Sequence, residues 1–114
     1  MVVSGTMNPY ETIDAVLDSS SPASPEVEGT LLMKGGSKGG YATATGVVQR
    51  RESSGAFKVV LESRLRGFAW GEIGAWTDAD DEHNRPFNFA VNQGASYRYR
   101  LESGSVSVRV GLTG

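Results

Sequence analysis

The chain of 114 residues contains no cysteine and only one histidine, His83. Without cysteine it can form no disulfide, no thiolate metal site and no cysteine nucleophile. With a single histidine it cannot build a metal site that needs two imidazole ligands from one chain. Because no other residue pattern suggests a nucleophile with a partnered base, we expect a protein that is not an enzyme and uses no cofactor or metal.

Long apolar runs are also missing. No segment approaches the ~20 apolar residues of a membrane-spanning helix, and the N-terminus lacks a basic region followed by an apolar run. The formal net charge of −2 argues against affinity for phosphate backbones. We therefore predict a soluble protein without a secretion signal that binds neither membranes nor nucleic acid.

Basic residues are absent from residues 1–28, which hold five acidic side chains, whereas the remainder holds eight acidic and eleven basic ones. This asymmetry favours an acidic N-terminal arm that lies on the basic body of its own chain or of a neighbouring copy. A solvated acidic tail is the alternative.

Residues 1–26 differ in composition and residue pattern from the rest of the chain, and we predict that they form this arm. Asn8 and Pro9 resemble a helix start, and a helical spacing then places four apolar side chains on one face. The predicted short helix spans residues 9–18, and the Ser/Pro-rich stretch after it is typical of a linker. The arm residues expected to contact a partner are Tyr10, Ile13, Val16 and Leu17.

From residue 27 to residue 114, short alternating runs follow one another between glycine-rich or polar turns. About seven such runs at this spacing predict an all-β domain, an antiparallel β-sandwich. In "GFAWGEIGAW", Trp70, Ile73 and Trp76 break the period of two. A bulge near Gly71 or Gly74 would turn both tryptophans inward, and the alternative is that one of them is an exposed contact.

The stretch "YRYRLESGSVSVRV" (residues 97–110) alternates on both sides of a Glu-Ser-Gly-Ser turn and predicts the last hairpin of a sheet. Its tyrosines and valines would face the core, so its arginines would face outward. Arginine rather than lysine is enriched at protein interfaces. The outward arginines expected to meet a partner on one sheet face are Arg64, Arg98, Arg100 and Arg109.

Two further segments have residues in common with known ion-binding or phosphate-binding loops. The acidic loop of residues 78–84 has alternating oxygen ligands, as at the start of a calcium loop, but it lacks the turn glycine and the closing glutamate. The glycine-rich stretch of residues 34–40 lacks the Gly-Lys-Ser/Thr ending of a phosphate loop. A solvated loop and a flexible connection are the favoured interpretations.

The order of these elements over residues 29–112, ending in "GASYRYRLESGSVSVRVGL", resembles the small β-sandwich virion proteins of tailed bacteriophages. The resemblance implies a structural role on the virion, most often as a capsid decoration or cement protein assembled in the host cytoplasm. It also implies the major capsid protein or other virion subunits as partners, and a homo-oligomer, usually a trimer. A head-fibre or tail adaptor is one alternative. The other is a carbohydrate-binding module in which Trp70 or Trp76 stacks on sugar and the acidic loop holds calcium.

Overall fold

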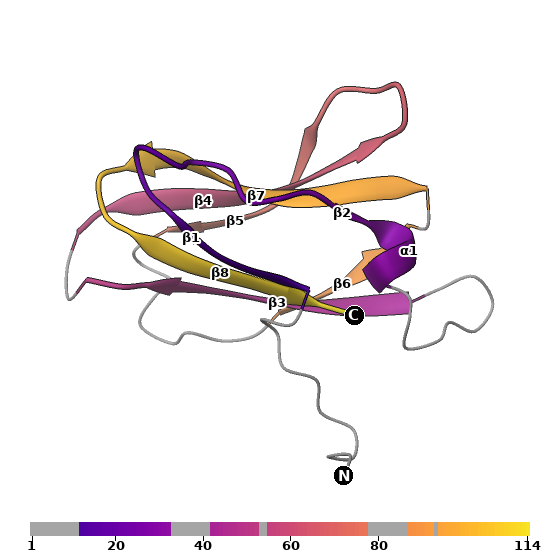
Figure 1. The fold of residues 1–114 in the computed structure, drawn as a ribbon, viewed down its shortest axis with the longest axis horizontal. Coiled ribbons are helices and arrows are strands. Elements are labelled where there is room, and N and C mark those ends of the chain that lie inside the picture. The colour runs from indigo at the N-terminus through magenta and orange to yellow at the C-terminus, as the bar shows by residue number, and fades with distance from the viewer. Residues whose placement is uncertain (1–11, 33–41, 53–54, 78–86, 93) are drawn as a thin grey trace, which may run out of the picture.

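The computed structural model describes residues 12–32, 42–52, 55–77, 87–92 and 94–114. Within these ranges the chain forms eight strands and one short helix, coloured by position in Figure 1. In chain order they are β1 (Ile13–Leu17), β2 (Val27–Glu28), α1 (Gly29–Leu32), β3 (Ala42–Arg50), β4 (Phe57–Leu65), β5 (Gly71–Thr77), β6 (Phe87–Val91), β7 (Ala95–Gly104) and β8 (Val108–Thr113).

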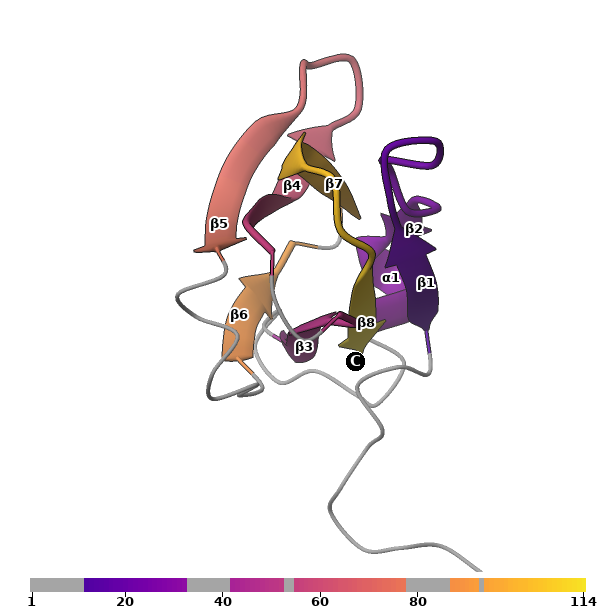
Figure 2. The same ribbon diagram turned by 90° about the vertical axis from the view of Figure 1, so that its left-hand side faces the viewer.

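The strands form two antiparallel sheets that face each other (Figures 1 and 2). Sheet A has the strand order β1-β8-β3-β6, and sheet B has the order β2-β7-β4-β5. All connections between sequential strands except β4 to β5 pass from one sheet to the other. Eight strands in this arrangement make a jelly roll, so the predicted all-β antiparallel sandwich is confirmed and its topology is now specified.

The core lies between the two sheets and is built from the alternating apolar residues of the strands. Tyr99 of β7 crosses it: its ring is fully buried, and its hydroxyl donates a hydrogen bond of 2.7 Å to the carbonyl of Gly111 in sheet A. Gly46 of β3 makes room for this side chain, because a Cβ there would collide with the Tyr99 hydroxyl and the Phe87 ring. The predicted inward direction of the tyrosines and valines of residues 97–110 is therefore correct.

The predicted hairpin of residues 97–110 is wrong. β7 pairs with β2 and β4 in sheet B, whereas β8 pairs with β1 and β3 in sheet A. Alternation along the chain reports which side of each strand is buried, but not which strand it pairs with. The Ser-Gly-Ser turn instead carries the chain from one sheet to the other.

The predicted helix over residues 9–18 is wrong where the structure describes it, because residues 13–17 form β1 and pair with β8. The same residues also alternate with a period of two: Ile13 and Leu17 are buried, whereas Asp14 and Val16 are exposed. So short a segment has no helix stability of its own. The open edge of sheet A therefore decides its conformation. Residues 1–11 lie outside the described residues, and so does Tyr10.

The Ser/Pro-rich stretch also belongs to the sandwich and is not a free linker. Ser24 is buried, and its N–H donates a hydrogen bond of 2.9 Å to the carbonyl of Tyr99. The Tyr99 N–H in turn donates to Ser24 Oγ (2.9 Å), and the Leu101 N–H donates to the Pro22 carbonyl. The predicted domain boundary at residue 27 therefore falls inside the jelly roll, since residues 13–26 complete the edges of both sheets.

Candidate interaction surface

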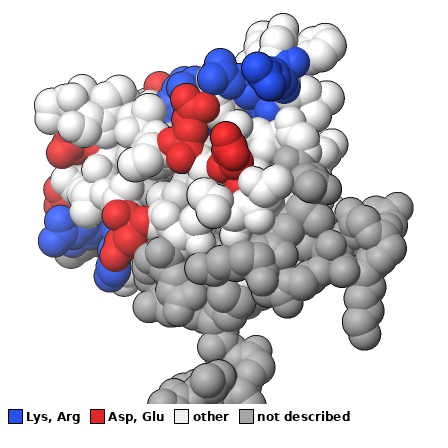
Figure 3. Space-filling view, turned by 45° about the vertical axis from the view of Figure 1, so that its right-hand side comes forward, with Lys and Arg blue, Asp and Glu red and all other residues white. Residues whose placement is uncertain are grey.

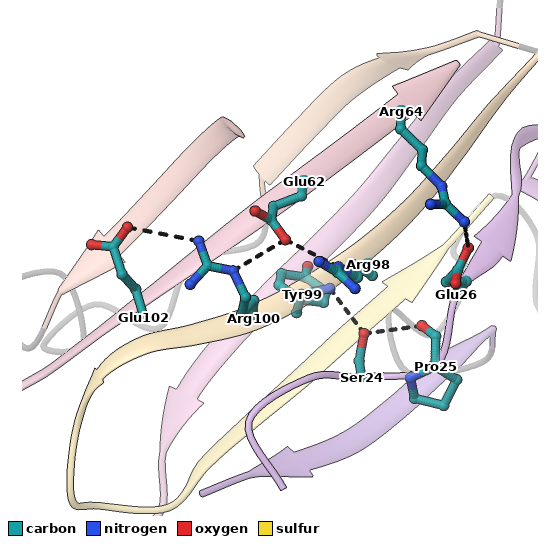
Figure 4. Close-up of polar contacts among 9 residues, drawn as sticks. All are labelled: Ser24, Pro25, Glu26, Glu62, Arg64, Arg98, Tyr99, Arg100 and Glu102. Carbon is teal, nitrogen blue, oxygen red and sulfur yellow. Dashed lines mark hydrogen bonds and ion pairs between the residues drawn. The ribbon is translucent and has the colours of Figure 1, made fainter. Parts of the chain in front are cut away.

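The outer face of sheet B carries a cluster of charged side chains from β4 and β7 (Figure 4). Its centre is Glu62, which is only 6% exposed. One carboxylate oxygen of Glu62 accepts from Arg98 Nε at 3.0 Å and lies 3.2 Å from Arg100 Nε. A buried carboxylate is tolerated when cations pair with it, so these two arginines hold Glu62 on the sheet.

At the edge of this cluster, the Lys58 ammonium lies 2.9 Å from the Glu102 carboxylate. The hydrogen bond from Lys58 lowers the pKa of Glu102, and the same contact raises the pKa of Lys58. The outer face is thus covered by side chains of both signs that pair with one another.

Trp70 lies over this outer face instead of in the core. The guanidinium carbons of Arg64 and Arg98 lie 4.6 and 4.2 Å from its ring centroid, within range of cation–π attraction. A register shift between Leu61 and Glu62 of β4 places a bulge in β5, next to Gly74, as predicted. However, only Trp76 turns inward, where its ring centroid lies 4.1 Å from that of Phe87.

The predicted contact residues are distributed over three environments. Ile13 and Leu17 are in the core, and Val16 is 38% exposed on sheet A. Arg64, Arg98 and Arg100 share the outer face of sheet B. Arg109 stands on the outer face of sheet A, so the expectation of a single face bearing all four arginines is wrong. The reason is the passage of the chain from β7 in one sheet to β8 in the other.

Arg109 forms a bidentate pair with Asp14 of β1, with both nitrogen–oxygen distances at 3.0 Å. The hydrogen bond from Arg109 lowers the pKa of Asp14. The acidic arm does meet an arginine, as the charge asymmetry predicted, but within the same chain and inside one sheet.

We expect the Asp14–Arg109 pair to make part of the stability depend on pH. Because the pKa of Asp14 is lower in the folded state than in the unfolded state, the pair stabilises the fold at pH values above the ordinary aspartate pKa of about 3.9. This stabilisation is lost as the pH falls through the folded-state pKa. Asp14→Asn should therefore lower the urea midpoint at pH 7 more than at pH 3. The measurement is urea unfolding of both proteins at several pH values, and a difference between them that does not change with pH would contradict the assignment.

The connection between β4 and β5 projects from sheet B on the side away from sheet A (Figures 1 and 2). Phe68 in this connection is 69% exposed, and Leu65 at the end of β4 and Ile73 in β5 are also exposed. Gly67 has a φ of 87°, which glycine adopts without strain and which allows the chain to reverse there. A projecting segment that exposes large apolar side chains is typical of a contact surface.

A groove of about 750 Å³ lies beside this connection. Because β7 lies between β2 and β4 in sheet B, its residues Ala95 and Ser96 line the groove between two walls. One wall carries Glu26 and Glu28 near β2, and the other carries Arg64, Arg66 and Phe68 from β4 and the projecting connection. Acidic and basic side chains lie next to one another over the upper part of the molecule in Figure 3.

Sequence reasoning missed the groove, although one signal was available. In "SRLRGFAW", four apolar side chains flank Gly67, and only some of them can be buried once the chain turns there. The acidic loop of residues 78–84 and the glycine-rich stretch of residues 34–40 lie outside the described residues. Among the residues that are described, no group of three or more potential ligands could hold a metal ion, and no helix is long and apolar enough to cross a membrane.

Comparison with known proteins adds support for the fold alone. No protein-family model matches the sequence, and no curated protein matches it significantly. One solved structure that is similar is that of a mitogen derived from Yersinia pseudotuberculosis. It is 11% identical, with a TM-score of 0.51, and the match covers 88% of this chain and 80% of that chain. At so low an identity the match supports a shared β fold and gives no information about function.

Proposed function

We propose that this chain is a non-enzymatic structural subunit of a tailed-phage virion that decorates the capsid. The observation that carries the adhesive part of this proposal is the projecting β4–β5 connection, with Phe68 exposed beside a groove lined by both signs of charge. A large exposed apolar side chain on a projecting segment, with charged residues beside it, favours binding to another protein. The jelly roll is an architecture that viral capsid domains use, and the virion setting itself rests on the layout of the sequence.

The contact surface in this proposal differs from the one expected from sequence. Ile13 and Leu17 are buried in the same chain and cannot dock elsewhere. The surface that remains is the outer face of sheet B together with the projecting connection. Such a subunit would stabilise the capsid by linkage, because it binds the assembled lattice and not the dissociated subunits.

The test is cosedimentation with capsids. The chain is coexpressed with the major capsid protein encoded in the same genome, and capsids are isolated by sedimentation. We expect the chain in the capsid fraction at a fixed ratio to the capsid protein, and we expect Phe68→Ser to lower this ratio at least about tenfold, since hot-spot residues dominate binding. Arg51→Ser is the control, because Arg51 is exposed at the far end of β3. Recovery of the unaltered chain only in the soluble fraction would contradict the proposal.

A carbohydrate-binding module is the second candidate, because jelly rolls also occur in lectins and an aromatic ring stands in a groove of ligand-site volume. The platform would then be Phe68. Trp76 packs against Phe87, and the Trp70 ring lies against two guanidinium groups. Binding of the chain to immobilised polysaccharides that Phe68→Ser abolishes, together with no capsid association, would favour this function over the first.

A further inference from the structure

The groove carries one acidic and one basic side chain that have no partner in the described part of the chain. The carboxylate of Glu28 and the guanidinium of Arg66 are exposed on the two walls, and neither makes a hydrogen bond or ion pair there. Their neighbours behave differently, since Arg64 and Glu26 pair across the groove at 3.2 Å. With respect to the residues that the structure describes, the groove thus offers one unpaired charge of each sign within a single surface.

Such a surface is complementary to itself. In a two-fold contact the same patch of both copies meets, so residue i of one copy contacts residue j of the other, and j contacts i. Arg66 of each copy can then face Glu28 of the other, which forms two ion pairs from one patch. A partner of one charge sign would satisfy one wall and repel the other.

Exposed apolar side chains lie in the groove or next to its lining residues along the chain. Phe68 lines the groove, Leu65 precedes the projecting connection, and Leu31 of α1 follows the groove residue Thr30. Of these, Phe68 is 69% and Leu31 is 55% exposed. Burial of aromatic and aliphatic side chains at the centre of a contact supplies most of its binding energy, while charged groups at the rim provide specificity.

The groove is also held in shape before any partner arrives. Both walls belong to one sheet, since β7 is hydrogen-bonded to β2 on one side and to β4 on the other. The Arg64–Glu26 pair ties the walls together (Figure 4). The Trp70 ring lies against the guanidinium groups of Arg64 and Arg98 and fixes the base of the projecting connection. A preformed surface has little ordering cost on binding.

We propose that a second copy of this chain docks in this groove about a two-fold axis. Arg66 of each copy pairs with Glu28 of the other, and Phe68 is buried between them. This inference rests on the proposed function only for its setting on a virion. It assigns the groove and Phe68 to the contact between sister subunits and leaves the rest of the outer face of sheet B for the capsid. Phe68→Ser then lowers capsid association by separating the two copies, because two linked copies bind more tightly than one. It replaces the trimer that the family resemblance implies with a two-fold pair.

Charge reversal tests the pairing directly. Purified full-length chain is examined by sedimentation equilibrium over a wide concentration range, and we expect a dimer. Arg66→Glu and Glu28→Arg should each weaken dimerisation at least tenfold, because like charges then face each other in both pairs. The double variant Arg66→Glu/Glu28→Arg should dimerise within about threefold of the unaltered chain, since the pairs are restored with their signs exchanged.

An equimolar mixture of the two single variants gives a second test. One variant carries acidic side chains at both positions and the other carries basic ones, so the mixture should form a heterodimer as tightly as the unaltered chain dimerises. Arg51→Glu is the matched control, because it makes the same charge change at an exposed arginine outside the groove. Phe68→Ser should also weaken the dimer while leaving the thermal midpoint of the monomer unchanged.

Three outcomes would overturn the proposal. The first is a chain that is monomeric at all concentrations, and the second is a trimer whose stability none of these substitutions alters. The third is a monomer whose Phe68 and Arg66 variants lose association with capsids, which would assign the groove to the capsid protein while leaving the proposed function intact. Dimerisation with the expected charge dependence but without capsid association would instead remove the virion function and leave this inference standing.

Discussion

Deletion of residues 1–26 should abolish folding of the domain, and not simply release an arm from it. The deletion removes β1 and with it Ile13 and Leu17, both buried in the core. Each such side chain contributes about 1.5–3 kcal/mol on burial. The deletion also exposes the edge of β8, and it removes residues 22–24, which form hydrogen bonds with β7. Since domains of this size are stable by only about 5–15 kcal/mol, these losses together should leave little folded protein.

A shorter deletion, of residues 1–11, is the matched comparison. It removes none of the residues that pair with β8, so the shortened chain should keep a cooperative urea transition and the near-ultraviolet circular dichroism of the buried aromatic residues. The chain that begins at residue 27 should show neither. If that chain folds with a cooperative transition, then β1 is dispensable and the arm is separable from the sandwich after all.

Replacement of Tyr99 should cause the largest loss of stability of any single residue in the core. Its ring is fully buried, and its hydroxyl donates a hydrogen bond to the carbonyl of Gly111 on the opposite sheet. Tyr99→Ala should lower the free energy of unfolding by about 3–5 kcal/mol, the range found when buried aromatic residues are truncated. Tyr99→Phe keeps the ring and should cost about 1 kcal/mol, the net value of one hydrogen bond.

Urea unfolding at pH 7, at a protein concentration low enough for the chain to be monomeric, measures both losses. Phe68→Ala is the control, because it removes an aromatic ring from a side chain that is 69% exposed. Surface substitutions usually change stability by less than about 0.5 kcal/mol. Equal losses for Tyr99→Ala and Phe68→Ala would mean that Tyr99 does not join the two sheets.

The alternation of apolar residues was sufficient to predict an antiparallel sandwich, and it placed the tyrosines and valines of residues 97–110 in the core correctly. Side-chain direction follows from strand geometry within a few residues, so the local sequence is sufficient to predict it. The outward direction of Arg64, Arg98, Arg100 and Arg109 followed from the same rule. Their distribution between two sheets did not, because pairing joins strands far apart in sequence, as in Arg109 with Asp14.

The conformation of residues 13–17 shows most clearly what the local sequence cannot decide. Ile13 and Leu17 share a face in both a helix and a strand, since four residues span about one helical turn and also an even number of strand positions. Local sequence therefore fits both conformations, and the free edge of β8 selects the strand.

The interaction surface required the tertiary structure for a similar reason. Glu28 and Arg66 are far apart in the chain, and they line one groove only because β7 brings β2 and β4 to its two sides. The sequence by itself determined the all-β class, the absence of cysteine chemistry and which side chains of residues 97–110 face the core. Only the tertiary structure decided which strands pair and which distant charges share a surface, because strand pairing is a long-range choice that local alternation does not encode.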